Sequence, residues 1–144
     1  MRPEHSVRQR LSAHAGVAPR APGAFQKEFD LQIDEGANAM VAVFAIPDGM
    51  TLDIESISTY ATAPTGQTPR LSITTTVKGD DATYFLPLAK QETVDRADWL
   101  CGTQPLRLYA DSRRVLLLIT RTQTVGNANF SISISGNLTL TATP

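Results

Sequence analysis

The C-terminal stretch FSISISGNLTLTA, residues 130–142, alternates large apolar and small polar side chains over thirteen positions and contains no charge. Successive side chains of an extended strand point to opposite faces of a sheet, so this pattern places one apolar face against a core. Edge strands usually carry lysine or proline to block pairing with other chains, and neither occurs here before Pro144. We therefore expect a central strand; pairing with another subunit and a polar wall facing a ligand are the alternatives.

The same period of two residues predicts about eight strands in the rest of the chain. The segment NAMVAVFAI is apolar on both faces and is expected to be a central strand covered on both sides. Pro87 places the end of its strand at a sheet edge, and a phase slip at Ser56–Ile57 predicts a β-bulge. Residues 90–104 are expected to be irregular or weakly helical. The predicted strands are 24–33, 38–46, 51–58, 70–77, 82–88, 105–110, 115–120 and 130–142.

These strands predict an all-β fold, because a parallel sheet needs a crossover helix after most strands and the sequence offers no convincing one. We expect an antiparallel two-sheet β-sandwich of about eight strands, jelly-roll-like. An immunoglobulin-like sandwich is the alternative, although its Cys…Trp…Cys signature is missing. The predicted organisation is a flexible basic arm at 1–23 and a β-sandwich domain at 24–144.

The arm and the predicted domain carry opposite charge. Residues 1–23 contain four arginines and one glutamate, a net charge of +3, and the remainder contains nine basic and thirteen acidic residues, a net charge of −4. We expect a homo-oligomer, with a trimer as the first form to test, that associates through sheet edges and through the arm, which lies on a neighbouring subunit. The residues predicted at this interface are Arg8, Arg10, Arg20, Ser133, Thr139 and Thr141.

Composition argues against several other partners. The net charge is only −1, which does not favour nucleic acid. No run approaches the ~20 apolar residues of a membrane span, and the N-terminus lacks the apolar run of a signal peptide. The compartment is left open.

The sequence offers little for catalysis. Its two histidines, His5 and His14, both lie in the arm, so the predicted domain has no histidine for a catalytic triad or a metal site. Cys101 is expected to be a buried or incidental thiol, with a reactive or intermolecularly paired thiol as the alternative. A hydrolase would need two carboxylates facing each other across a cleft. We therefore predict a non-enzymatic binding or assembly module without a cofactor.

A carbohydrate-binding module at the cell surface is the second hypothesis. Trp99, Tyr60 and Tyr109 are candidate platforms for stacking sugar rings, although aromatic residues make up only 6% of the chain and most are expected in the core.

Three blocks of sequence resemble a group of small uncharacterised bacterial β-sandwich proteins. The first block is IPDGMTLDIESIS, in which Ile46, Pro47, Gly49, Leu52, Ile54, Glu55, Ile57 and Ser58 match the pattern. The second is QPLRLYAD, matching at Gln104, Leu106, Arg107, Leu108, Tyr109, Ala110 and Asp111, and the third is SISGNL, matching at Ser133, Ile134, Ser135, Gly136 and Leu138. The resemblance implies a fold but no activity. Members of the group commonly look exported, and the arginine-bearing arm of this chain departs from that pattern.

Overall fold

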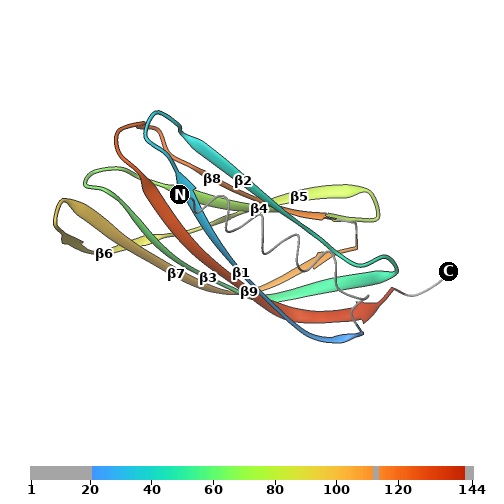
Figure 1. Ribbon diagram of the computed structural model, residues 1–144. Helices are drawn as coiled ribbons and strands as arrows, with labels where there is room; N and C mark the ends of the chain where they lie inside the picture. The colour runs from blue at the N-terminus through green and yellow to red at the C-terminus, as the bar shows by residue number, and fades with distance from the viewer. Residues whose placement is uncertain (1–20, 112–113, 142–144) are drawn as a thin grey trace.

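The computed structural model describes residues 21–111 and 114–141, and every regular element in these two ranges is a β-strand (Figure 1). The strands are β1 (Gly23–Ile33), β2 (Ala39–Ala45), β3 (Met50–Pro64), β4 (Arg70–Val77), β5 (Asp80–Leu86), β6 (Ala89–Val94), β7 (Ala97–Ala110), β8 (Arg114–Thr120) and β9 (Ala128–Leu140).

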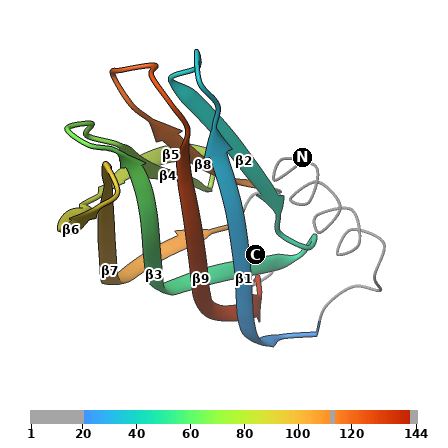
Figure 2. The ribbon, with the colours of Figure 1, turned by 60° about the vertical axis from the view of Figure 1, so that its left-hand side comes forward.

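The strands form two stacked antiparallel sheets. Sheet A has the order β1-β9-β3-β7-β6, and sheet B has the order β2-β8-β4-β5. Figure 2 shows β7, β3, β9 and β1 side by side in sheet A. Only the β4–β5 and β6–β7 connections stay within one sheet, and all others cross between the sheets.

This strand order is that of a jelly roll, as predicted. The first and last strands are neighbours in sheet A, β2 and β8 are neighbours in sheet B, and β6 extends sheet A beyond a core of eight strands. The immunoglobulin-like alternative is wrong, because that fold keeps its first two strands in one sheet. Here β1 and β2 lie in different sheets.

Several positional predictions can be compared with this order. β9 is central, paired with β1 on one side and β3 on the other, so the prediction from its uncharged pattern is confirmed. β5 is an edge strand that ends immediately before Pro87, also as predicted. The prediction for NAMVAVFAI is wrong, because β2 lies at the edge of sheet B and Val41 is 50% exposed.

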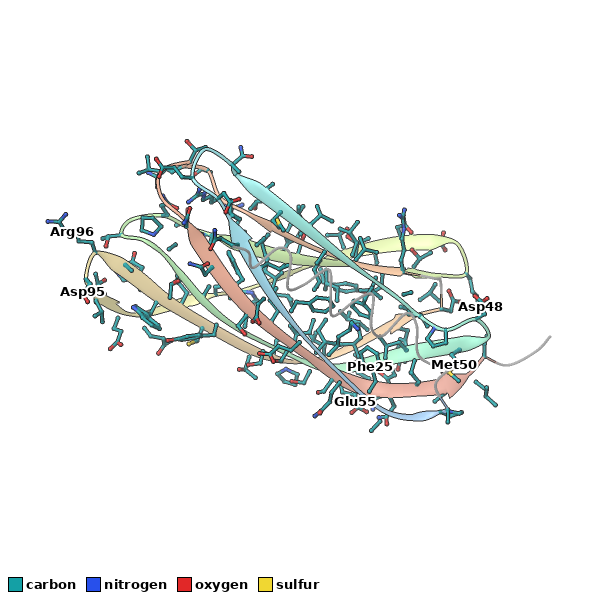
Figure 3. All side chains as sticks on the ribbon, viewed as in Figure 1. Phe25, Asp48, Met50, Glu55, Asp95 and Arg96 are labelled. Atoms are coloured by element: carbon teal, nitrogen blue, oxygen red, sulfur yellow. The ribbon has the colours of Figure 1, made fainter. Side chains whose placement is uncertain are left out.

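The expectation of irregular or weakly helical structure at 90–104 is also wrong. This region forms β6 and the first half of β7, joined by the two-residue turn Asp95–Arg96 at the tip of the hairpin (Figure 3). Both turn residues have positive φ, 51° and 65°, as in a type I′ turn. The turn lacks the usual glycine, and every residue of β6 is exposed. The sequence AKQETV therefore shows no alternation of apolar and polar residues, and no turn signal marked this hairpin.

The core between the sheets is hydrocarbon, and aromatic rings join the two layers. Phe44 of β2 stacks on Phe25 of β1 at 5.8 Å between centroids and contacts Phe29 at 5.5 Å. Every apolar side chain on the inner face of β9 up to Leu138 is buried. The largest fully buried side chains are Phe29, Leu31, Ile33, Leu52, Ile54, Ile57, Leu71, Ile73, Leu117, Ile119, Ile132 and Ile134.

The predicted bulge is present in β3. The pairing of β3 with both neighbours shifts between Ile54 and Ser56. Against β9 the additional residue is Glu55 of β3, whereas against β7 the additional residue lies on β7. Figure 3 shows Glu55 on the outer side of sheet A. Gly136 of β9 pairs with Ile54 at this point, and a Cβ at Gly136 would lie 2.0 Å from the carbonyl oxygen of Asp53. The bulge and the glycine therefore allow β3 and β9 to approach closely.

A buried arginine holds together the three loops at one end of the sandwich, which gather at the top of Figure 2. Arg121 is 3% exposed and follows β8 directly. Its guanidinium donates hydrogen bonds to carbonyl oxygens of the β1–β2 and β8–β9 loops and to the side chain of Gln67 in the β3–β4 loop. The arrangement satisfies polar groups that would otherwise be buried without partners.

Candidate functional site

The outer face of sheet A is polar and carries two shallow hollows. Its residues are the outward halves of the alternating strands, and hydroxyl side chains predominate on β9 and β3. One hollow, of about 250 Å³, is lined by Asp30, Leu31, Tyr60, Thr62, Trp99, Asn129, Phe130 and Ser131. The other, of about 380 Å³, is lined by Gln26, Lys27, Glu28, Ser56, Ser58, Ser133, Ile134 and Ser135.

Tyr60 and Trp99, two of the three predicted ligand-binding aromatics, come together in the first hollow. The pairing of β3 with β7 sets Thr62 opposite Trp99 and Tyr60 opposite Cys101, so the two rings are neighbours on one face. Their centroids are 5.2 Å apart and the planes are tilted by 49°. The third aromatic, Tyr109, lies eight residues from Cys101 along β7, which is roughly 27 Å of strand at ~3.4 Å per residue.

The aromatic residues are more exposed than expected. Tyr60 is 46% exposed and Tyr109 is 44% exposed. The indole Nε1 of Trp99 is covered and has no hydrogen-bond partner among residues 21–111 and 114–141, as is also true of Asp53 Oδ1. A covered donor without a partner typically costs about 1–3 kcal/mol. A hydrogen bond from the indole therefore does not hold Trp99 in its place on the face.

The polar groups beside the aromatic pair are held in place by hydrogen bonds. Ser131 Oγ lies 3.0 Å from Asp30 Oδ1 and 3.1 Å from Glu28 Oε2, and can donate to either carboxylate. Farther along the face, Asn137 Nδ2 donates to Glu55 Oε2 at 2.9 Å. Glu28 and Asp30 lie side by side on β1 and do not face each other across a cleft, so they lack the arrangement of a glycosidase pair.

The predicted interface residues are separated in the structure. Ser133 is exposed on the second hollow, and Thr139 and Thr141 lie beside Thr51 at the far end of β9. Arg8, Arg10 and Arg20 lie outside the described residues. Because β9 is paired on both sides within its own chain, Ser133 can meet a partner only through the face of the sheet.

A buried carboxylate lies next to Trp99. Asp98 is 3% exposed, and its Oδ2 accepts a hydrogen bond from the backbone N–H of Gly66 at 3.0 Å. Its Oδ1 accepts one from the Thr93 hydroxyl at 2.7 Å. These two bonds, the one from Gly66 foremost, lower the pKa of Asp98 from its ordinary value of 3.8.

Asp98→Asn is expected to lower the free energy of unfolding at neutral pH, because an amide cannot accept with both terminal atoms. A lowered pKa in the folded state stabilises the fold above the ordinary value of 3.8, and this stabilisation is lost as the pH falls through the lowered pKa. Urea unfolding from about pH 7 to about pH 3 should therefore show the two proteins converging in acid. Asp95→Asn, in the adjacent exposed turn, is the control; an equal loss there would contradict this role for Asp98.

Sheet B has an apolar outer face. Val41 and Val43 of β2 pair with Leu118 and Leu116 of β8, and Ser72 pairs with both Leu118 and Phe85. Phe85 is 77% exposed, and Val43, Leu116 and Leu118 are half-buried. We call Val41, Val43, Phe85, Leu116 and Leu118 the apolar face of sheet B.

The edge of this sheet formed by β2 also lacks charge. β2 reads AMVAVFA, whereas the other three edge strands all carry charged residues: Lys27, Glu28 and Asp30 in β1, Asp80 and Asp81 in β5, and Lys90 and Glu92 in β6. Charged side chains, proline and bulges are the usual means of preventing edge-to-edge pairing. β2 has none of them.

Other kinds of site find no support in the described part of the chain. No group of three or more histidine, cysteine or carboxylate residues there could hold a metal ion. Cys101 is a free, half-buried thiol in β7. Within the same ranges, no helix has the length and apolar character needed to cross a bilayer.

No family model matches this chain, and no curated protein matches it. Among solved structures, it is similar to infectious bursal disease virus, Gx strain, at 13% identity and a TM-score of 0.44, covering 85% of this chain and 33% of that chain. It is also similar to the VP2 subviral particle of infectious bursal disease virus, at 14% identity and a TM-score of 0.42, covering 87% of this chain and 39% of that chain. The chain thus spans well under half of either of those chains.

Proposed function

We propose that this jelly-roll domain is a non-enzymatic assembly module that associates with copies of itself through β2 and the apolar face of sheet B. The observation that carries the proposal is the uncharged edge of β2 beside exposed apolar side chains. An unpaired edge strand presents backbone N–H and C=O groups that another strand can pair with. Burial of the adjoining side chains would add about 25 cal/mol for each Å² of apolar surface removed from water.

A second copy fits this edge by symmetry. In an antiparallel pair the residues directly opposite each other point to the same face, so a two-fold pairing must keep outward residues opposite outward residues. Centring the pairing on Ala42 sets Val41 opposite Val43 of the other copy and uses all seven residues of β2. Two four-stranded sheets would thereby become one continuous eight-stranded sheet.

The basic N-terminal segment supplies a second contribution to this assembly. Arg8, Arg10 and Arg20 belong to a segment of net charge +3, and the rest of the chain has net charge −4. Attraction between the segment of one copy and the acidic face of sheet A of another would guide association and weaken as salt is added. Pairing at β2 by itself produces a dimer; the trimer expected from sequence stays a prediction.

Val41→Lys tests the edge. Val41 is 50% exposed, so lysine can be accommodated in the monomer, whereas a pair would bring its ammonium against Val43 of the partner. We expect the full chain to sediment at about 100 µM as an oligomer of its 15.6 kDa unit, with the dissociation constant raised at least about tenfold in the variant. Ala89→Lys, on the edge strand β6 that already carries Lys90 and Glu92, should leave the mass unchanged.

Two results would contradict the proposal. One is a full chain that stays monomeric at this concentration, and the other is an oligomer that Val41→Lys leaves intact.

A chain beginning at Ala21 should associate through β2 with a weaker dependence on salt. Association of this shortened chain alone, with the full chain monomeric, would show that the edge is covered by its own N-terminal segment.

A further inference from the structure

We propose that the outer face of sheet A binds a neutral oligosaccharide, with the rings of Tyr60 and Trp99 as the stacking platform. This site is separate from the β2 edge and the apolar face of sheet B, because it lies on the other sheet. The inference depends on four properties of the face: the aromatic pair, the polar groups around it, the continuation into a second hollow, and the sign of the charge.

The aromatic pair presents an apolar surface that contacts water when no ligand is bound. Tyr60 lies at the surface of β3 and Trp99 at the surface of β7, 5.2 Å apart and tilted by 49°, at the floor and wall of a hollow of about 250 Å³. The C–H faces of a sugar ring are apolar and can be laid on such rings, while its hydroxyls remain at the periphery. Neither ring contributes to the buried core of the sandwich.

The groups around the rings match the hydrogen-bonding needs of sugar hydroxyls. Each sugar hydroxyl can both donate and accept, and the hollow offers an acceptor carboxylate in Asp30, an amide in Asn129, and hydroxyls in Thr62 and Ser131. Asp30 and Ser131 are 3.0 Å apart, so their positions are set before a ligand arrives. Pre-set polar groups reduce the entropy lost on binding.

The second hollow continues the first along the strands. Ser133 follows Ser131 on the same face of β9, and Ser58 precedes Tyr60 on the same face of β3. Such positions lie about 6.8 Å apart, which is two steps along a strand. The two hollows therefore form one track parallel to β3 and β9, suited to several linked sugar units more than to one.

The charge of the face selects against anionic ligands. Five carboxylates lie on this side of sheet A, on Glu28, Asp30, Asp53, Glu55 and Glu92, which pairs with Trp99. The basic side chains near them are Arg107 and Lys27, and the ammonium of Lys27 lies over the ring of Phe29. A phosphate backbone or a sulfated glycan would be repelled by this excess of negative charge. A neutral oligosaccharide meets no such penalty.

Binding can be followed through Trp99, which is the single tryptophan of the chain. Cellohexaose, xylohexaose and mannohexaose are titrated against the full chain, with a heparin hexasaccharide and the corresponding monosaccharides as comparisons. We expect at least one neutral hexasaccharide to change the emission with a dissociation constant of about 10 µM to 1 mM. We also expect it to bind at least about tenfold more tightly than its monosaccharide.

Variants then locate the site. Tyr60→Ala and Trp99→Ala should each weaken binding at least about tenfold in titration calorimetry, with the melting temperature confirming that the exposed Tyr60→Ala variant is folded. Tyr109→Ala is the matched control: it removes an equally exposed tyrosine from the same sheet, outside both hollows, and should retain full affinity. Val41→Lys should also bind normally, which distinguishes this site from the assembly surface.

The inference is wrong if no neutral hexasaccharide binds at about 5 mM, if the heparin fragment binds more tightly than the neutral ones, or if Tyr109→Ala weakens binding as much as Tyr60→Ala. Normal binding by a monomeric wild-type chain would leave this inference intact and contradict only the assembly proposal.

Discussion

Replacing Arg121 with methionine is expected to lower the free energy of unfolding by about 3–5 kcal/mol. The guanidinium is buried and donates to four acceptors: Ala37 O at 3.1 Å, Asp34 O at 3.0 Å, Val125 O at 3.2 Å and Gln67 Oε1 at 3.1 Å. Methionine fills much of the same volume but donates nothing. The acceptors of three loops would then lie partly buried without this donor, at about 1–3 kcal/mol for each group that water cannot reach.

Gln67 shares in this loss. Its side chain is 6% exposed, and Nε2 donates to Val125 O at 2.7 Å, the same carbonyl that accepts from Arg121. The backbone N–H of Arg121 also donates to Asn38 O at 2.9 Å, a bond that methionine keeps. The loss should therefore loosen the loops while the strands remain paired.

Urea unfolding followed by far-ultraviolet dichroism measures the effect of Arg121→Met. Arg121→Lys retains the charge but cannot reproduce the planar fork, so an intermediate loss of about 2 kcal/mol is expected. Arg70→Met removes an exposed arginine from β4 and should change the free energy by less than about 0.5 kcal/mol. Equal stabilities for Arg121→Met and Arg70→Met would show that the buried guanidinium does not hold the loops.

Gly136→Ala is expected to lower the free energy of unfolding by about 3 kcal/mol, because a central strand has no room for one more carbon. The new Cβ would lie 2.0 Å from the carbonyl oxygen of Asp53, 2.9 Å from its carbonyl carbon and 3.0 Å from the Cα of Ile54. All three atoms are backbone, so no side chain can rotate away. β3 and β9 would have to separate at the bulge, where Asn137 also bonds Glu55.

Thermal and urea unfolding of Gly136→Ala can be compared with Ser133→Ala, which changes an exposed position of the same strand. The serine variant should unfold within about 0.5 kcal/mol of the wild type. Wild-type stability of Gly136→Ala would mean that the strands are not as close at the bulge as this structure has them.

The sequence could identify the candidate aromatics but not their arrangement. Tyr60 and Trp99 are separated by nearly forty residues, and only the register of β3 with β7 makes their rings neighbours. Tyr109 has the same residue type and similar exposure, yet it lies elsewhere on the sheet. Residue type is a local property, whereas proximity depends on pairing between distant segments.

Arg121 was missed for a different reason. Charged side chains are usually exposed, and a single arginine after a strand carries no sequence signal of burial. Its partners are mostly backbone carbonyl oxygens, which every residue has, so no complementary side-chain pattern could indicate the cluster. A buried carboxylate such as Asp98 is hidden in the same way, because one of its two donors is the backbone of Gly66.

Side-chain alternation determined most of the strands and the antiparallel sandwich, because a period of two residues is imposed by the geometry of each strand, but it did not mark β6 or the first half of β7. The bulge in β3 could be predicted for the same reason, since it shifts that period. The central place of β9 followed from its lack of charged and edge-blocking residues. Only the tertiary structure decided that β2 is an edge, because AMVAVFA has the same local pattern with or without a neighbour on its open side. Which strands become neighbours depends on how distant segments pack, and that choice gives this domain its uncharged edge and its aromatic hollow.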